Sequence, residues 1–277
     1  MADGVTRMKR NKKRFFLCIP GAVLILVSAV FLLIWRSNTF TYSNLYDNDS
    51  QTLFQTLLLE RGIPEQNIRN VLSQTDTFYS TPFRGLVTEG WKKASIPFFS
   101  YRNEDGFAHL DTQPDNLINC RMTAFQIIKD SISFGETTLS VKEEKDVRSR
   151  KLLTDPDDLH RYDLLFADLE DPGIASSDEL VQLFTDYWKD ARIQFKGSIC
   201  LIMANGASSG ILQNFHTAIA VYEEDCIWLF EKYDPIHPYQ LSRFDCEEDM
   251  IRYMKKRVQG IEYAAVFAND TCLWKRG

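Results

Sequence analysis

The spacing of apolar residues changes along the chain from a helical period to an alternating one. In the earlier part, apolar residues recur every three or four positions, which predicts amphipathic helices. These helices are expected over residues 49–60, from residue 64 onward, over 119–134 and over 180–188. Later, short runs rich in β-branched and aromatic residues are bounded by Gly, Asn and acidic residues, which predicts strands. The strands are expected over residues 198–203, 216–222, 226–231, 239–244 and 263–267, with a further helix over 247–258.

This order of elements predicts an α+β domain in which helices come first and an antiparallel sheet follows. Between residues 75 and 113, proline and glycine interrupt the pattern, so irregular structure is expected there. The helix at 180–188 has a clear start signal, because Ser176 followed by Glu179 forms a capping box.

One segment ahead of these helices is apolar without interruption. Residues 15–35 form a run of 21 residues without a charge, which as a helix spans roughly 31 Å and matches a bilayer core. A cleaved signal peptide is the alternative, but the apolar run exceeds the usual length of such a segment and no small-residue cleavage site follows it. The sequence therefore predicts a basic tail over residues 1–14, an N-terminal transmembrane helix over 15–35 and one α+β domain over 37–277.

Charge is distributed unevenly around this segment. Seven of the 32 basic residues and one of the 38 acidic residues lie in the first 36 positions, which leaves a net charge of −12 from Ser37 onward. The basic end predicts a cytoplasmic N-terminus, with the domain outside the cell membrane. The acidic remainder argues against nucleic acid as a partner. The expected partner is the membrane itself, through residues 15–35.

Five cysteines follow the apolar segment, an odd number that leaves at least one unpaired in an oxidising compartment. Their wide spacing, without a C-x-x-C pair, indicates neither a zinc ribbon nor a dense disulfide framework. Cys200 and Cys226 lie in strand-like runs and suit a buried apolar role. Cys120 differs, because it precedes an expected helix.

Cys120 stands where a nucleophile is expected, since free N–H groups and the dipole at a helix start favour the thiolate. Such a nucleophile needs a general base and an acceptor that orients it. His216 starts an expected strand, and a two-residue turn after that strand would place Glu231 on the same sheet face. A one-residue change in the loop would place Lys232 there instead, and Asp234 is the fallback if a bulge intervenes. The Cys120 backbone N–H would contribute to an oxyanion hole.

Other interpretations compete with this one. Cys120 and His216 also fit a purely structural role, the first packed against apolar helices and the second at a strand edge. Asp155 and Asp157 form a D-x-D arrangement of the kind that holds a nucleotide-bound metal in glycosyltransferases, but the intervening proline favours a helix-start turn. No metal site is predicted, and the chain lacks a glycine-rich phosphate loop, so no cofactor is expected.

Several short motifs, taken in order, resemble domain-of-unknown-function family 4300, an uncharacterised family of bacterial surface proteins. The resemblance runs from about residue 41 to the C-terminus. Members are mostly surface proteins or lipoproteins of Gram-positive bacteria. The motifs are residues 41–45 (TYSNL), 119–125 (NCRMTAF), 215–218 (FHTA), 230–232 (FEK) and 238–240 (PYQ).

The order of these motifs is similar to the papain-like NlpC class, in which a cysteine at a helix start precedes a histidine on a strand and a polar residue on the next strand. The resemblance implies Cys120 as nucleophile, His216 as general base and Glu231 as the orienting residue. Tyr42 and Asn44 are expected to line the site, although a plain turn before a helix explains them equally well. The implied activity is a thiol amidase or peptidase acting on cell-wall peptide or peptidoglycan. A non-catalytic surface binding or scaffolding protein on the same fold is the alternative, and a glycosyltransferase is third.

Overall fold

A nine-stranded antiparallel sheet organises the fold. In the computed structural model, which describes residues 38–100, 118–135 and 150–277, its strands follow the order β11-β10-β6-β7-β8-β9-β1-β2, and β4 pairs with β7. A smaller sheet consists of β3 and β5. The strands are β1 (Thr39–Ser43), β2 (Lys92–Ser95), β3 (Ile132–Phe134), β4 (Leu169–Glu170), β5 (Ile193–Phe195), β6 (Ile199–Ser208), β7 (Ile211–Tyr222), β8 (Ile227–Lys232), β9 (Tyr239–Phe244), β10 (Ala264–Ala268) and β11 (Thr271–Arg276).

The chain divides into two units, Met1–Thr39 and Phe40–Gly277. Every element described below belongs to the second unit, apart from Thr39 at the start of β1. Its helices are α2 (Asn48–Leu59), α3 (Glu65–Tyr79), α4 (Cys120–Ile128), α6 (Pro156–Leu165), α7 (Ser177–Asp190) and α8 (Glu247–Met254), with 3-10 turns η1 (Pro82–Leu86) and η3 (Lys255–Val258).

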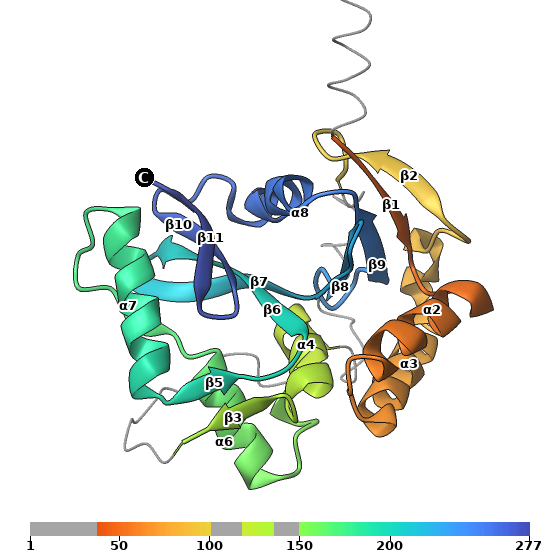
Figure 1. Ribbon diagram of the computed structural model, residues 1–277, viewed down its shortest axis with the longest axis horizontal. Coiled ribbons are helices and arrows are strands. Elements are labelled where there is room, and N and C mark those ends of the chain that lie inside the picture. Colours follow the sequence, from red (N-terminus) through yellow and green to blue (C-terminus); the bar gives the residue numbers. More distant parts are fainter. Residues whose placement is uncertain (1–37, 101–117, 136–149) are drawn as a thin grey trace, which may run out of the picture. The chain divides into compact units, whose positions relative to one another are not determined.

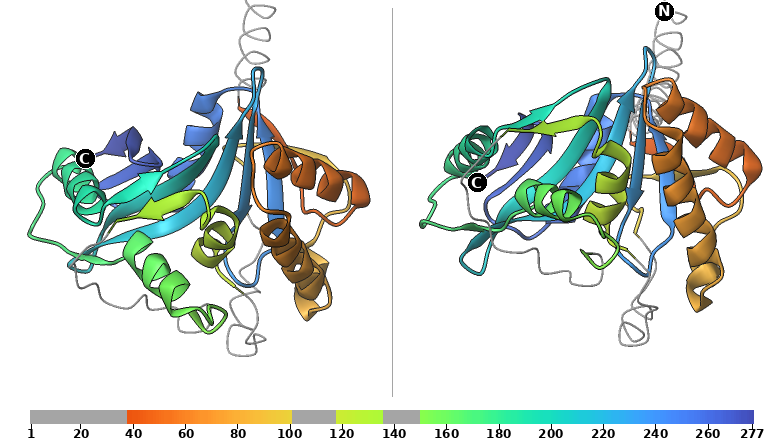
Figure 2. Two further views of the ribbon diagram at one scale, coloured as in Figure 1. Left: turned by 60° about the horizontal axis from the view of Figure 1, so that its bottom comes forward. Right: turned by 90° about the horizontal axis from the view of Figure 1, so that it is seen from below.

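Helices cover both faces of the main sheet, as Figure 1 and Figure 2 show. Successive side chains of a strand point to opposite faces, and β6 shows the consequence. Leu201 joins a core with Phe54 of α2 and Phe125 of α4, whereas the next residue, Ile202, joins a second core with Tyr253 of α8. Each face therefore has its own hydrophobic core, and the candidate site residues lie where the helices meet the central strands.

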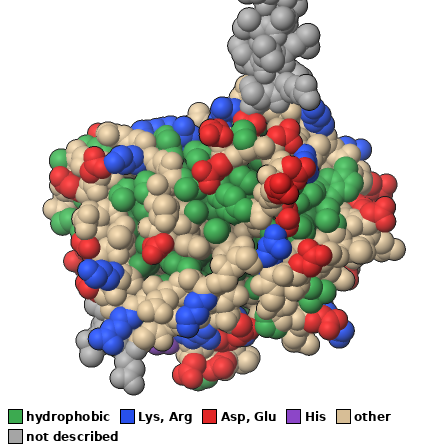
Figure 3. Space-filling view, in the orientation of Figure 1, with side chains coloured by type: hydrophobic (Ala, Val, Ile, Leu, Met, Phe, Trp, Pro, Cys, Tyr) green, Lys and Arg blue, Asp and Glu red, His purple; other side chains and the backbone are tan. Residues whose placement is uncertain are grey.

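The surface seen in Figure 3 carries apolar side chains in the region of β11 and α8, with acidic and basic side chains scattered around them. Leu273 and Trp274 of β11 are partly buried and pack against the core under α8.

Strand β11 was not predicted from the sequence. It pairs with β10 through a register irregularity at Val266 and Phe267, which hides the alternation that would mark it.

The predicted fold class needs correction. No helix in residues 38–100, 118–135 and 150–277 is long and apolar enough to cross a bilayer. The predicted fold class began with a transmembrane helix, and for the described residues that part of the prediction is wrong. The fold of these residues is α+β with an antiparallel sheet. The segments predicted as tail and anchor, residues 1–14 and 15–35, lie outside the described residues.

The order of helices before sheet is also wrong, because strand β1 precedes every described helix. Residues 41–43 pair antiparallel with β9, with Tyr42 opposite Ser242. β1 was missed because its partner β9 lies about 200 residues later in the chain, and a five-residue strand carries too little periodicity to be recognised alone.

The helix predicted over residues 119–134 is too long. α4 ends at Ile128, and Ile132–Phe134 form β3, whose Ile132 pairs with Phe195 of β5. Tertiary pairing outweighs the helical spacing here, since β-branched Ile132 fits either pattern. Other predictions are confirmed: β9 spans the expected residues 239–244, and the Ser176 hydroxyl caps α7 by accepting from Glu179 N at 3.3 Å.

Candidate active site

Cys120 is the first residue of α4. The preceding Asn119 has extended backbone angles, and its side chain accepts a hydrogen bond from Met122 N at 2.8 Å. Asn119 is thus a helix N-cap, which fixes where the helix begins. The Cys120 thiol therefore lies at the positive end of the helix dipole, as the sequence predicts.

His216 lies on β7 directly after a bulge. β7 pairs with β6 so that Ala204 is opposite His216 while Asn205 is opposite Asn214, which leaves Phe215 as the extra residue. The Asn214 amide secures this irregular backbone by donating to Asn205 Oδ1 at 2.8 Å and to the His216 carbonyl at 3.0 Å. The bulge and its amide braces set the direction in which the imidazole points.

The length of the β7–β8 turn decides whether Glu231 or Lys232 shares the sheet face of His216. Glu223 N donates to the Cys226 carbonyl at 2.9 Å, so Glu224 and Asp225 form a two-residue turn. This register places Glu231 opposite Ala218, one same-face position beyond His216. Lys232 therefore points to the opposite face, where its ammonium lies 4.1 Å from the Phe78 ring centroid.

Three of the predicted site residues meet at this point. His216 Nε2 lies 2.5 Å from Glu231 Oε2, and the imidazole interacts electrostatically with the Cys120 thiol. Because Nε2 faces the carboxylate, Nδ1 is the ring nitrogen left for the thiol. Cys120, His216 and Glu231 are all buried, with His216 and Glu231 each only 1% exposed. The order thiol, imidazole, carboxylate is that of an activated nucleophile with an oriented base.

Electrostatic coupling between Cys120 and His216 lowers the pKa of the thiol and raises the pKa of the imidazole. Burial alone raises the pKa of the Cys120 thiol, but His216 and Arg121 more than offset it, so this pKa lies below its ordinary value. Burial lowers the pKa of His216, yet Cys120 and Glu231 raise it above the ordinary value. The cluster therefore favours a thiolate–imidazolium pair over the neutral thiol and imidazole.

The second carboxylate oxygen of Glu231 is bound by two side chains, one from η3 and one from α8. Arg257 of η3 donates to Glu231 Oε1 at 2.9 Å, and the Tyr253 hydroxyl of α8 hydrogen-bonds the same oxygen. Burial raises the pKa of Glu231, but Arg257, His216 and the Tyr253 hydrogen bond lower it far below the usual range. The carboxylate is thus kept ionised although it is buried.

Sequence analysis missed Tyr253 and Arg257. Both residues were only placed within the helix expected over residues 247–258, without a role in the site. The one available signal was the four-residue spacing from Tyr253 to Arg257, which places both on one face of the expected helix. Nothing local shows that this face meets Glu231.

Asp234, the fallback for orienting the histidine, has a different partner. Its Oδ2 lies 2.7 Å from His237 Nδ1, and its Oδ1 accepts from the backbone N–H groups of Ile236 and His237 at 2.9 and 3.0 Å. Asp234 therefore stabilises the turn between β8 and β9, and Glu231 is the carboxylate that meets His216.

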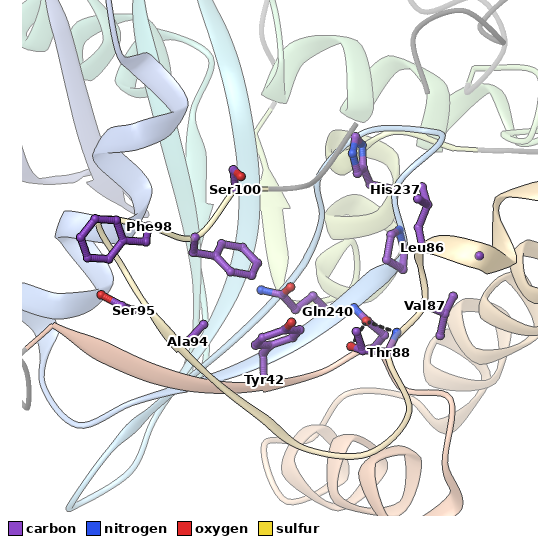
Figure 4. Close-up of a pocket in the computed structure, with 14 residues that line it drawn as sticks. Tyr42, Leu86, Val87, Thr88, Ala94, Ser95, Phe98, Ser100, His237 and Gln240 are labelled. Carbon is purple, nitrogen blue, oxygen red and sulfur yellow. Dashed lines mark hydrogen bonds between the residues drawn. The ribbon is translucent and has the colours of Figure 1, made fainter. Parts of the chain in front are cut away.

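Tyr42 and Asn44 line a cavity of about 690 Å³ (Figure 4), together with Gln240 and His237. The Asn44 side chain is engaged internally, because its Nδ2 donates to the Tyr239 carbonyl at 3.1 Å and its Oδ1 accepts from Thr88 N at 3.0 Å. Asn44 thus fixes the cavity wall, while Tyr42 forms part of its aromatic surface.

The remaining candidates carry no site in the described residues. Asp155 is the N-cap of α6 and accepts from Asp157 N at 2.9 Å, which confirms the helix-start interpretation of the D-x-D arrangement. Within residues 38–100, 118–135 and 150–277, no three His, Cys, Asp or Glu side chains gather in a way that suits a metal ion. The five cysteines from Cys120 to Cys272 are all free thiols.

The fold and this geometry define an α+β protein with a buried cysteine–histidine–glutamate cluster at the junction of a helix start and two central strands. The chain belongs to the family described as Domain of unknown function (DUF4300), which matches residues 41–271. Comparisons with curated proteins and with solved structures found no match.

Lys232 leads to a prediction about stability. Burial lowers its pKa to about 7, an effect that Asp234 partly offsets. Between that value and 10.5, the unfolded chain binds more protons than the folded protein, so this residue makes stability rise with pH. We expect Lys232→Met to gain stability over the wild type, and the gain to be about 2–3 kcal/mol larger at pH 6 than at pH 9.

Urea unfolding of both proteins at the two pH values measures this difference. Lys93→Met, at an exposed position of β2, is the matched control and should show no such change. A gain for Lys232→Met that is equal at both pH values would contradict a lowered pKa.

Proposed function

We propose that this protein is a thiol hydrolase that cleaves a peptide amide bond, with Cys120 as nucleophile, His216 as general base and Glu231 as the residue that orients and stabilises the imidazole. The observation that carries the proposal is the buried cluster of Cys120, His216 and Glu231, in which His216 hydrogen-bonds Glu231 and interacts with the Cys120 thiol, whose pKa it lowers. The papain-like order of these residues along the chain supports the same assignment.

The proposed reaction has two stages. Cys120 Sγ attacks the carbonyl carbon, the amide C–N bond breaks, and the imidazolium of His216 gives its proton to the leaving amine. Water then attacks the thioester as His216 accepts a proton from it, and the acid and the free thiolate are released. Backbone N–H groups at the start of α4 would stabilise the oxyanion in both stages, because the first N–H groups of a helix have no partner within it.

Glu231 contributes by holding a negative charge beside the imidazolium. It stays ionised because Arg257 and Tyr253 bind its second oxygen, so its charge is available wherever the protein is folded at neutral pH. A neutral residue in this place would still orient the ring but would stabilise the imidazolium less.

The first substrates to test are cell-envelope peptides and peptidoglycan. The extracytoplasmic location that makes them accessible stays a prediction of residues 1–35, which lie outside the described part of the chain. The alternative, a non-catalytic binding protein on the same fold, gives no reason for a buried Cys120 whose pKa is lowered by a buried histidine.

The proposal is tested by incubating the full chain with purified peptidoglycan and following newly formed amines by mass spectrometry. We expect product with the wild type and none above the blank with Cys120→Ala. Cys226→Ala is the matched control, because Cys226 is also a buried free thiol but its pKa is raised, and it should retain full activity. Equal product from Cys120→Ala and the wild type would refute the hydrolase.

A further inference from the structure

The cavity of about 690 Å³ beside the site has walls from four separate segments of the chain. Its volume is in the range of ligand-binding cavities. Figure 4 shows Tyr42, Thr88, Phe98 and Gln240 around it. The residues that line it include Tyr42, Asn44, Thr88, Phe98, Phe99 and Gln240, and no Asp, Glu, Lys or Arg of residues 38–100, 118–135 and 150–277 is among them.

Gln240, one of the residues that line this cavity, has a buried side-chain oxygen without a hydrogen-bond partner among the described residues. The residue lies opposite Glu231 in the β8–β9 ladder, and its side chain is buried. Its Nε2 donates to Ser242 Oγ at 2.8 Å and to the Tyr253 hydroxyl oxygen at 3.0 Å. No residue in the described part of the chain hydrogen-bonds Gln240 Oε1. A buried acceptor without a partner is unfavourable, and a ligand N–H would satisfy it.

The charge of Glu231 fixes this orientation of the Gln240 amide. The Tyr253 hydroxyl has one hydrogen, and it is donated to the ionised carboxylate of Glu231. The group of Gln240 that meets the Tyr253 oxygen must therefore be a donor, which is the amide NH₂. The amide cannot turn over to satisfy its oxygen without losing this bond. The cavity wall is thus linked through Tyr253 to the proposed catalytic carboxylate.

Two braces hold the cavity walls in place. Asn44 Oδ1 accepts from both the backbone N–H and the hydroxyl of Thr88, at 3.0 and 2.7 Å. On the other side, Lys256 Nζ donates to the carbonyls of Ile96, at 2.9 Å, and Phe99. The aromatic wall is therefore fixed by η3, the same element whose Arg257 binds Glu231.

We propose that this cavity binds an uncharged peptide segment, with an apolar or aromatic side chain against Tyr42, Phe98 and Phe99 and a backbone N–H donated to Gln240 Oε1. The peptide is the substrate of the hydrolase, a statement that rests on the proposed function. The peptide-binding site itself does not depend on it.

The probe is N-acetyl-L-phenylalaninamide, an uncharged molecule with one aromatic side chain and amide N–H groups. Its affinity for the full chain carrying Cys120→Ser is measured by isothermal titration calorimetry. We expect saturable binding that Gln240→Met weakens by at least about tenfold. N-acetyl-L-aspartic acid α-amide should bind at least about tenfold more weakly than the probe, because no Lys or Arg of the described part of the chain lines the cavity to bind its carboxylate.

Gln194→Met is the matched control, since Gln194 is an exposed strand residue outside this cavity, and it should bind the probe as the unsubstituted chain does. Phe98→Ala gives a second test, because Phe98 is 79% exposed and its loss should leave folding intact while weakening binding severalfold. The peptide site is overturned if the probe does not bind, or if Gln240→Met and Phe98→Ala both bind it with the affinity of the chain without these two substitutions. If Cys120 proves unreactive but the probe binds in a way that depends on Gln240, the peptide site is supported and only the proposed hydrolase function is refuted.

Discussion

Iodoacetamide should alkylate Cys120 of the wild-type protein rapidly at pH 6 and at least about a hundredfold more slowly in His216→Ala. The reagent reacts with the thiolate, whose fraction falls tenfold for each pH unit below the thiol pKa. In the wild type, His216 lowers that pKa below its ordinary value. Without the imidazole, burial acts with less opposition and the pKa rises, so little thiolate is left at pH 6.

The pH dependence has a definite sign. Labelling of the wild type should continue as pH falls below the ordinary thiol value and should decline only when pH passes the lowered pKa of Cys120. Labelling of His216→Ala should decline at higher pH. The two rates therefore converge in alkaline solution, where both proteins carry the thiolate, and they differ most near pH 6.

The modified residue is located by mass spectrometry, and Cys226 is the internal reference. Cys226 is a free thiol whose pKa burial raises, so it should remain slow in both proteins at pH 6. Circular dichroism verifies that His216→Ala remains folded. An equal rate for Cys120 in both folded proteins would show that His216 does not activate the thiol.

Arg257→Met should lower the free energy of unfolding at pH 7 by about 3–5 kcal/mol, because it removes the guanidinium that neutralises the buried carboxylate of Glu231 from its second oxygen. Arg257 and Glu231 are both well buried, with side chains 6% and 0% exposed, so water cannot replace the lost charge. Tyr253 and His216 still bind the carboxylate, but Tyr253 is neutral and the positive charge of His216 is shared with the Cys120 thiolate.

This loss should shrink in acid. In the wild type, the folded-state pKa of Glu231 is depressed, so its stabilising contribution is present above the ordinary value of 4.5 and is lost as pH falls below it. In Arg257→Met the ionised form is penalised, and protonation relieves the penalty. The two unfolding free energies should therefore approach each other between pH 7 and pH 4.

The double variant Arg257→Met with Glu231→Gln removes both charges and should recover part of the lost stability, which chemical denaturation measures. Arg69→Met is the matched control, because Arg69 pairs with Glu65 on the exposed side of α3 and should change stability by less than about 1 kcal/mol. A double variant no more stable than Arg257→Met would mean that Arg257 acts through packing and not through the charge of Glu231.

Much of the site follows from local patterns in the sequence. The helix start at Cys120 depends on Asn119 as N-cap, and both residues are adjacent in the chain. The choice of Glu231 over Lys232 depends on a two-residue turn and the strict alternation of a strand, which are also local. The sequence did not determine the length of this turn, because three consecutive acidic residues allow more than one choice of turn residues. The structure supplied it.

The cavity was beyond sequence analysis for a different reason. Its walls combine residues 42–44, 85–88, 94–100 and 237–240, and these segments come together only through strand pairing across the sheet and the bonds between Asn44 and Thr88. Tyr42 and Asn44 were candidates on resemblance alone, and their separate tasks, aromatic surface and brace, depend on neighbours far along the chain.

Local chemistry therefore determined where Cys120, His216 and Glu231, the residues of the proposed site, lie in their helix and strands, because capping, turn geometry and alternation act over a few residues. Tertiary packing alone decided that Arg257 and Tyr253 would bind Glu231, that Gln240 would be left with an unsatisfied oxygen, and that β1 would close one side of a cavity. These contacts join residues that are distant in the chain, and apolar periodicity states only that a face is buried, not which residues it will meet.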